Sequence, residues 1–182
     1  MDSKRLCIYY AAGNAQAVGK DKMSKTVKCS TMDDIAAGEK QNISTFDLET
    51  QYGRLRILMD DNFLWLRPFC EDIQPLLLLK DNWDFHGAQR VTLPAIEKCF
   101  AVMESLMRKG TPSPHVSAHP WGGLQLEWQS ERLLLQVTVS DVGSLSAYGK
   151  DMSTNQDWEI EKIADRKRIR DELQSLTAAC AA

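Results

Sequence analysis

The chain has 182 residues, of which 43% are hydrophobic, enough for one domain with a substantial core. Its net charge is −3, and residues 1–45 carry only two more basic than acidic residues, so no segment has the basic excess typical of a nucleic-acid-binding protein. The five cysteines include no C-x-x-C pair, and no apolar stretch approaches the length of a signal peptide or a membrane span, so we expect a soluble cytoplasmic protein.

The N-terminal part of the chain, residues 1–44, is expected to hold one strand, Leu6–Ala11, followed by a polar segment without clear periodicity. From residue 45 onward, two runs of alternating apolar and polar residues flank a turn at Tyr52, which predicts a β-hairpin. Residues Phe63–Leu66 are expected to add a third strand, which Pro68 would end.

Two helices are predicted in the middle of the chain. A short one is expected from Asp72 to Lys80, with Pro75 in its first turn. After a loop at Asn82–Ala88, Thr92 is the predicted N-cap of the best-defined helix, which Gly110 would end. Its apolar residues recur at helical spacing and comprise Ile96, Cys99, Phe100, Met103, Leu106 and Met107. We therefore expect this helix to pack on a flat surface.

A run of alternating strands follows a linker that contains Pro112 and Pro114. The predicted strands cover residues 124–128, 133–139 and 145–148, and a charged helix is expected from Asp157 to Leu176. The predicted fold is α+β: an antiparallel meander packed by one central helix, in a core domain of residues 45–150, with a charged C-terminal helix in residues 151–182.

His115 and His119 are candidate metal ligands, because residues four apart on a helix share one face. The neighbouring prolines disfavour a helix, so we interpret both as ordinary loop histidines. Cys99 paired with a histidine could supply a nucleophile and base, but its place on the apolar stripe favours core packing. We therefore assign no catalytic residue, metal ligand or cofactor.

Carboxylate pairs occur at two turns, and such pairs can serve general acid–base chemistry. Asp81 and Asp84 flank Trp83, whereas Asp60 and Asp61 are adjacent. In both places we favour the structural role of Asp in turns, where its side chain accepts backbone hydrogen bonds.

Two glycine sites invite comparison with phosphate-binding loops. Gly122-Gly123 precedes a strand, but no Lys-Ser/Thr pair or helix N-terminus follows, so a turn leading into the strand is favoured. Gly13-Asn14 falls short of a dinucleotide-binding fingerprint.

The candidate partner-binding residues lie in three places. They are Trp83, Asp84, Phe85 and His86 in the first aromatic block (residues 82–88), Trp121 in the second aromatic block (residues 121–128), and Arg166 and Arg170 in the charged C-terminal helix. Fixed aromatic side chains are frequent hot spots of protein interfaces. Acidic residues interleave with the basic ones of the C-terminal helix, which favours a solvated or partner-binding face over a nucleic-acid contact.

Two sequence blocks carry a resemblance to a known group of proteins. These are Asn82-Trp83-Asp84-x-x-Gly87-Ala88 and Gly122-Gly123-Leu124-Gln125-Leu126-Glu127-Trp128, separated by one helix. They resemble a widespread set of small, uncharacterised bacterial and phage proteins with the patterns N-W-D-G-Y-G-A and G-G-x-x-L-E-W, and depart from them at Phe85 and His86. The resemblance covers roughly residues 70–150. It implies an α+β fold and a setting among mobile elements, phages and toxin or defence systems, and it carries no catalytic residues.

We expect a non-enzymatic protein-interaction factor, antitoxin-like, inhibitory or acting in counter-defence, that binds and occludes a protein partner. One alternative is a small enzyme or ligand-binding domain with a pocket at the Asn82–Ala88 loop, where Asp84 and His86 would act as acid and base. A weaker alternative is a nucleic-acid accessory protein.

Overall fold

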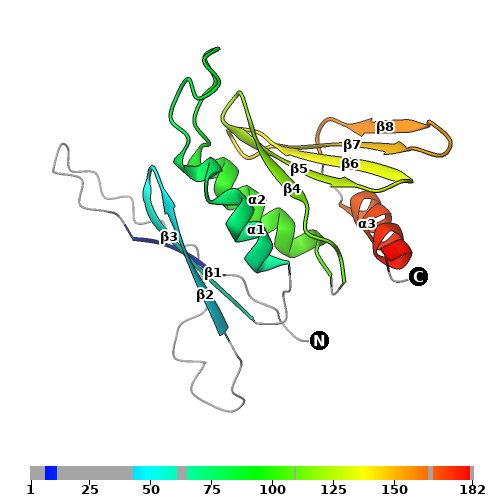
Figure 1. The fold of residues 1–182 in the computed structure, drawn as a ribbon, viewed down its shortest axis with the longest axis horizontal. Coiled ribbons are helices and arrows are strands. Elements are labelled where there is room, and N and C mark those ends of the chain that lie inside the picture. The colour runs from blue at the N-terminus through cyan, green and yellow to red at the C-terminus, as the bar shows by residue number, and fades with distance from the viewer. Residues whose placement is uncertain (1–6, 12–42, 61–64, 109, 164–165, 181–182) are drawn as a thin grey trace.

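Two antiparallel sheets form the outer layers of the molecule (Figure 1). The computed structural model describes residues 7–11, 43–60, 65–108, 110–163 and 166–180. The smaller sheet has the order β1-β3-β2 and comprises β1 (Cys7–Ala11), β2 (Ile43–Thr50) and β3 (Gly53–Asp60). The larger sheet follows chain order and comprises β4 (His115–His119), β5 (Gly123–Gln129), β6 (Leu133–Val139), β7 (Leu145–Asp151) and β8 (Asp157–Ile160). The α+β class, the hairpin and the meander are thereby confirmed.

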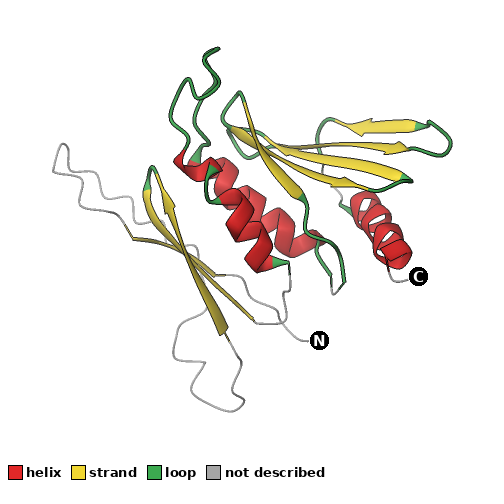
Figure 2. Cartoon of the chain, viewed as in Figure 1, coloured by secondary structure: helices red, strands yellow, loops and turns green. Residues whose placement is uncertain are grey.

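Helices fill the space between the sheets (Figure 2). They are α1 (Leu66–Ile73), the short 3-10 helix η2 (Leu76–Leu78), α2 (Leu93–Leu106) and α3 (Lys167–Cys180). Helices α1 and α2 lie between the two sheets, and α3 packs beside α2 under the larger sheet. The central layer therefore holds two helices, so the prediction of one central helix is only roughly met. No helix in the described part of the chain has the length and apolar character to cross a membrane.

Helix α2 forms as predicted. Thr92 has extended backbone angles, and its hydroxyl accepts a hydrogen bond from the backbone N–H of Ala95, 3.3 Å away, which satisfies one of the free donors of the first turn. All six residues of the predicted apolar stripe are buried. The helix ends at Leu106, before the predicted stop at Gly110.

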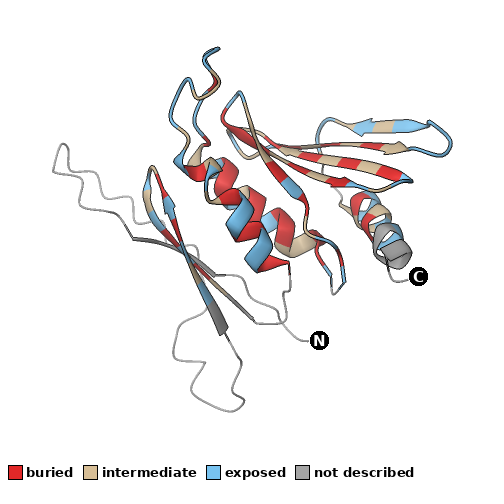
Figure 3. Cartoon of the chain, in the orientation of Figure 1, coloured by how far each residue is buried: buried red, intermediate tan, exposed pale blue. Residues whose placement is uncertain are grey.

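One continuous core joins both sheets through the helical layer (Figure 3). Phe69 of α1 and Phe100 of α2 meet edge to face, with ring centroids 5.2 Å apart, and Trp65 contacts Phe69 in the same way at 5.8 Å. Leu55 and Ile57 of the smaller sheet belong to the same cluster and are fully buried. The aromatic residues therefore connect α1 to α2 within a core that also includes residues of both sheets.

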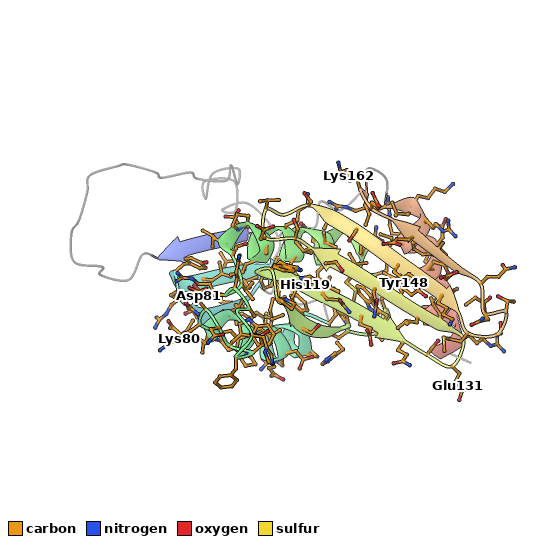
Figure 4. All side chains as sticks on the ribbon, turned by 90° about the horizontal axis from the view of Figure 1, so that it is seen from above. Lys80, Asp81, His119, Glu131, Tyr148 and Lys162 are labelled. Carbon is orange, nitrogen blue, oxygen red and sulfur yellow. The ribbon has the colours of Figure 1, made fainter. Side chains whose placement is uncertain are left out.

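The larger sheet has one buried and one polar face. Side chains alternate between buried and half-buried along β5, β6 and β7, as expected for a sheet covered on one side. Strand register places His115, Glu127, Gln136, Tyr148 and Glu159 in one row across the polar face. Figure 4 looks onto this face, with Tyr148 near its middle.

The predictions for residues 65–80 were wrong, whereas residues 63 and 64 lie outside the described part of the chain. Leu66 begins α1 instead of ending a strand, and Pro68 occupies the first turn of that helix, where a missing N–H leaves no hydrogen bond unmade. The helix expected from Asp72 to Lys80 is absent: α1 ends at Ile73, and only the 3-10 turn η2 follows.

The charged helix predicted from Asp157 to Leu176 begins later than expected. Residues Asp157–Ile160 form edge strand β8, and the helix begins at Lys167. The indole of Trp158 lies over Gly149 of the neighbouring strand, where an added Cβ would come 2.3 Å from the indole Cε2. A tryptophan that covers a glycine across two strands explains why this segment pairs with β7.

The predicted loop around the two histidines is also a strand. His115 and His119 are the first and last residues of β4, an edge strand of the larger sheet. Prolines 114 and 120 flank it, which an edge strand tolerates because one side of its backbone has no neighbouring strand. The predicted features at Gly13-Asn14 and Asp61 lie outside the described residues.

Candidate functional site

Four loops meet around the N-terminus of α2 and expose large hydrophobic side chains. We call this surface the loop end and define it by Tyr52, Phe85, Trp121 and Val142. Phe85 is 87% exposed, Val142 71%, Trp121 70% and Tyr52 40%. In Figure 4, Lys80 and Asp81, which precede the Asn82–Ala88 loop, lie at the opposite end of the molecule from Glu131.

The Asn82–Ala88 loop is held by its own hydrogen bonds. The backbone N–H of Asn82 donates to the carbonyl of Ala88 at 2.6 Å, and the Asn82 side chain accepts from the N–H of Gly87 at 2.9 Å. The Asp84 carboxylate accepts from the N–H groups of His86 (2.8 Å) and Ala88 (2.9 Å). These bonds fix the backbone of the loop, and with it the position from which an exposed side chain projects.

The polar groups of Trp83 and Asp84 make hydrogen bonds that hold the Asn82–Ala88 loop in shape. The N–H groups of Ala88 and His86 lower the pKa of Asp84 below its usual value, so the carboxylate stays ionised and occupied by backbone donors. The indole N–H of half-buried Trp83 donates to the carbonyl of Gln89 at 3.1 Å. Trp83 and Asp84 therefore brace the loop, as predicted for the Asp81 and Asp84 turn, and Phe85 is the side chain that the loop displays.

Thr92 ties two other loops to the start of α2. Its backbone N–H donates to the carbonyl of Gly122 at 2.9 Å, which holds the β4–β5 turn. Its hydroxyl donates to the carbonyl of Asp141 in the β6–β7 turn, while accepting from Ala95 in the helix. The single residue Thr92 therefore holds both turns: its backbone N–H holds the turn that carries Trp121, and its hydroxyl holds the turn that carries Val142.

The second aromatic block lies directly beside the first. Gln89 donates its backbone N–H to the carbonyl of Pro120 at 2.7 Å and forms a parallel bridge with Trp121. Gly122 has φ +81°, and a Cβ there would come 2.9 Å from the Arg90 carbonyl, so both backbone conformation and close approach favour glycine. The favoured interpretation of Gly122-Gly123 as a turn before a strand is confirmed, since β5 begins at residue 123.

The β2–β3 hairpin completes the loop end. The Tyr52 hydroxyl donates to the carbonyl of Val91 at 3.2 Å, which anchors the hairpin tip just before α2. Arg90 contacts Asp81 at 3.3 Å, and its backbone N–H donates to the Asp81 side chain at 3.0 Å. Positive and negative charges are therefore paired at the base of the loops, and the exposed tips are apolar.

The basic residues of the C-terminal helix lie elsewhere and contact their own chain. Arg166 donates to the Ser105 hydroxyl of α2, and the guanidinium of Arg168 lies 4.2 Å above the ring centre of Trp158. Arg170 is half-buried one turn after Arg166. In Figure 1, α3 lies near the C-terminal end of α2, whereas the Asn82–Ala88 loop lies near the N-terminal end of α2. The structure thus separates Arg166 and Arg170 from the aromatic residues.

The acid–base alternative gains no support from this geometry. Asp84 bonds to the backbone of His86, while the exposed His86 imidazole has no bond to Asp84. A shallow depression of about 450 Å³ occurs instead at the other end of β4 and β5, where His115, Glu127 and Trp128 line it. Cys99 is fully buried, which raises the pKa of its thiol, so its predicted role in the core is confirmed.

Two residues of the loop end, Tyr52 and Val142, were not among the predicted partner-binding residues. Tyr52 was placed only in a hairpin turn, and Val142 only between Asp141 and Gly143 in another. An apolar residue at the tip of a tight turn is the feature by which both could have been noticed, because turn tips are ordinarily polar.

Comparison with known protein families, curated proteins and solved structures yielded no match to this chain. The geometry of the loop end is therefore the basis on which a function is proposed.

Proposed function

We propose that this chain is a non-enzymatic protein-interaction factor that binds and occludes a protein partner through the loop end. The observation that carries the proposal is that four loops far apart in sequence are held around the start of α2, and each exposes a large hydrophobic side chain: Tyr52, Phe85, Trp121 or Val142. Exposed aromatic and aliphatic side chains held on rigid loops are typical of protein interfaces, where a few large side chains supply most of the binding energy.

The rigidity of the loops supports this proposal. Hydrogen bonds from Thr92 and Tyr52 hold three of the four loops to the start of α2, and the Asn82–Ala88 loop holds itself. A surface that is already ordered loses little conformational entropy when it binds, so more of the contact energy appears as affinity. The resemblance of the two aromatic blocks to bacterial and phage proteins supports an antitoxin-like, inhibitory or counter-defence role for such a factor in a bacterial or phage setting.

The charge at the loop end favours a protein over a nucleic acid. Among the described residues of these loops, Lys80 and Arg90 are matched by Asp81, Asp84 and Asp141, so these loops carry no basic excess that could neutralise phosphates. Binding that falls steeply with added salt would contradict this part of the proposal.

The test begins with the tagged protein as bait in a lysate of its own host, followed by mass spectrometry and sizing of the complex. The captured partner is then purified and its affinity measured by calorimetry for two loop-end variants, Trp121→Ser and Val142→Ser. The matched control is Met152→Ser, because Met152 is also exposed (44%) but lies in the β7–β8 turn. We expect the Trp121 variant to raise Kd at least about tenfold and the control to leave it unchanged. The proposal would be overturned if all three variants raised Kd equally, or if neither loop-end variant raised it.

A further inference from the structure

Phe85 combines an unfavourable backbone conformation with almost complete exposure. Its φ is +62°, in the left-handed region that L-residues other than Asn and Asp rarely adopt, and that is unfavourable for a bulky side chain. Within the described ranges, the other non-glycine residues with positive φ are Asn82 and Asn155, for which the conformation is ordinary. Phe85 is therefore the unusual residue of the Asn82–Ala88 loop.

The folded chain gains little from a phenylalanine at this position. The side chain is 87% exposed, so it buries little apolar surface in the protein itself. The left-handed conformation is imposed from both sides, because Asn82 accepts the Phe85 backbone N–H at 3.1 Å and Asp84 accepts the N–H of His86. A glycine would satisfy the same turn without strain. The fold by itself thus gives no reason for the ring.

We infer that Phe85 is the anchor residue of the loop end, and that its ring enters a concave apolar pocket on the protein partner. This inference rests on the proposed function and names the residue on which binding depends most. Strained residues that persist in a well-determined loop are found where function requires them. Because the loop is already fixed, its backbone loses little conformational entropy when the ring binds, as is typical of a hot-spot residue.

A protein pocket fits the surroundings of Phe85 better than a lipid surface does. Membrane-binding loops with exposed aromatic residues depend on nearby Lys and Arg to attract anionic headgroups. Here Arg90 is paired with Asp81, and Lys80 is offset by Asp84, so the loop presents an apolar tip on an electrically balanced base. Such a tip matches a neutral, concave site.

The first arm of the test compares the thermal stability of two variants with the wild type. Phe85→Ala removes the ring but keeps a Cβ and therefore the strain, so its Tm should match that of the wild type. Phe85→Gly removes the ring and the strain and should raise Tm by about 1–4 °C, after allowing for the greater freedom of glycine in the unfolded chain. A Tm for the glycine variant equal to or below that of the alanine variant would overturn the claim of strain.

The second arm measures the affinity of both variants for the purified partner. Each should raise Kd by about 30-fold or more, although one is as stable as the wild type and the other more stable. Unchanged Kd values for both, with binding still lost in Trp121→Ser, would overturn the anchor role and leave the proposed function standing. If the wild-type chain captures no partner, or if Trp121→Ser and Val142→Ser also leave Kd unchanged, the proposed function is wrong and the anchor role of Phe85 with it.

A third arm addresses lipid surfaces with vesicles of equimolar phosphatidylcholine and phosphatidylserine. We expect the wild-type protein to remain in the supernatant when the vesicles are sedimented. Sedimentation that depends on Phe85 would overturn the assignment of a protein pocket as its binding site.

Discussion

Thr92 offers the sharpest test of how the loop end is held together. We predict that Thr92→Val, which replaces the hydroxyl by a methyl group of similar size, destabilises the protein. Valine accepts the extended backbone of this position (φ −83°, ψ 156°), so the change removes hydrogen bonds without disturbing the chain path. The backbone bond from residue 92 to the Gly122 carbonyl also remains.

The magnitude follows from the two bonds that the hydroxyl makes. Loss of the N-cap bond to Ala95 costs about 1 kcal/mol. Loss of the bond to the Asp141 carbonyl costs about 1 kcal/mol more, since that carbonyl lies in a half-buried turn where water can replace part of the interaction. The expected loss of about 2 kcal/mol corresponds to a fall in Tm of about 4–8 °C for a protein of this size.

The assay is urea unfolding monitored by tryptophan fluorescence, with Thr92→Ser as the matched control. Serine keeps the hydroxyl and should retain most of the stability that valine loses. If the valine variant is as stable as the serine variant, Thr92 does not connect the turns to α2 as argued. The valine variant should also bind the partner more weakly, because the turn that carries Val142 loses one of its attachments.

Three further predictions concern other parts of the structure. Gly149→Ala should lower the free energy of unfolding in urea by about 1–3 kcal/mol, because the new Cβ would overlap the Trp158 indole at 2.3 Å, and adding Trp158→Ala should make the loss less than additive. The folded-state pKa of Asp84 is below its ordinary value of 3.8, so its charge stabilises the fold above that pH and the stability is lost as pH falls through the folded pKa. The difference in Tm between wild type and Asp84→Asn should accordingly be present at about pH 7 and disappear on acidification. Burial raises the pKa of Cys70 to about 12 and also raises the pKa of Cys99, so mass spectrometry of the two peptides should find both thiols unalkylated at about pH 8 in native protein and alkylated after unfolding.

The elements predicted correctly are those whose burial pattern has a clear local period. The stripe of α2 repeats at helical spacing, and most residues of β5, β6 and β7 alternate in burial, because each element packs one face against the core. Segments with conflicting patterns were misassigned. Pro68 was taken as the end of a strand, although it lies in the first turn of α1, and Trp158 was assigned to a helix, although its position is set by Gly149 on a neighbouring strand.

In the candidate site, too, the features that depend on neighbouring residues were predictable from the sequence. The sequence by itself determined that Asn82–Ala88 is a loop held by turn chemistry, since Asn, Asp and Gly at these positions make local backbone bonds. The structure decided that Trp83 braces this loop and that Phe85 is exposed. It also determined the helix cap at Thr92, which depends on residues within one turn.

Only the tertiary structure decided which loops share a surface. Tyr52 bonds to Val91 across 39 residues, and Thr92 bonds to Asp141 across 49 residues, so the meeting of these loops depends on how the sheets pack against α2. The same packing directs Arg166 toward Ser105 and away from the aromatic residues. Local periodicity reports which face of an element is buried, but it carries no information about which distant turn lies beside it, because that contact is fixed by the packing of the whole core.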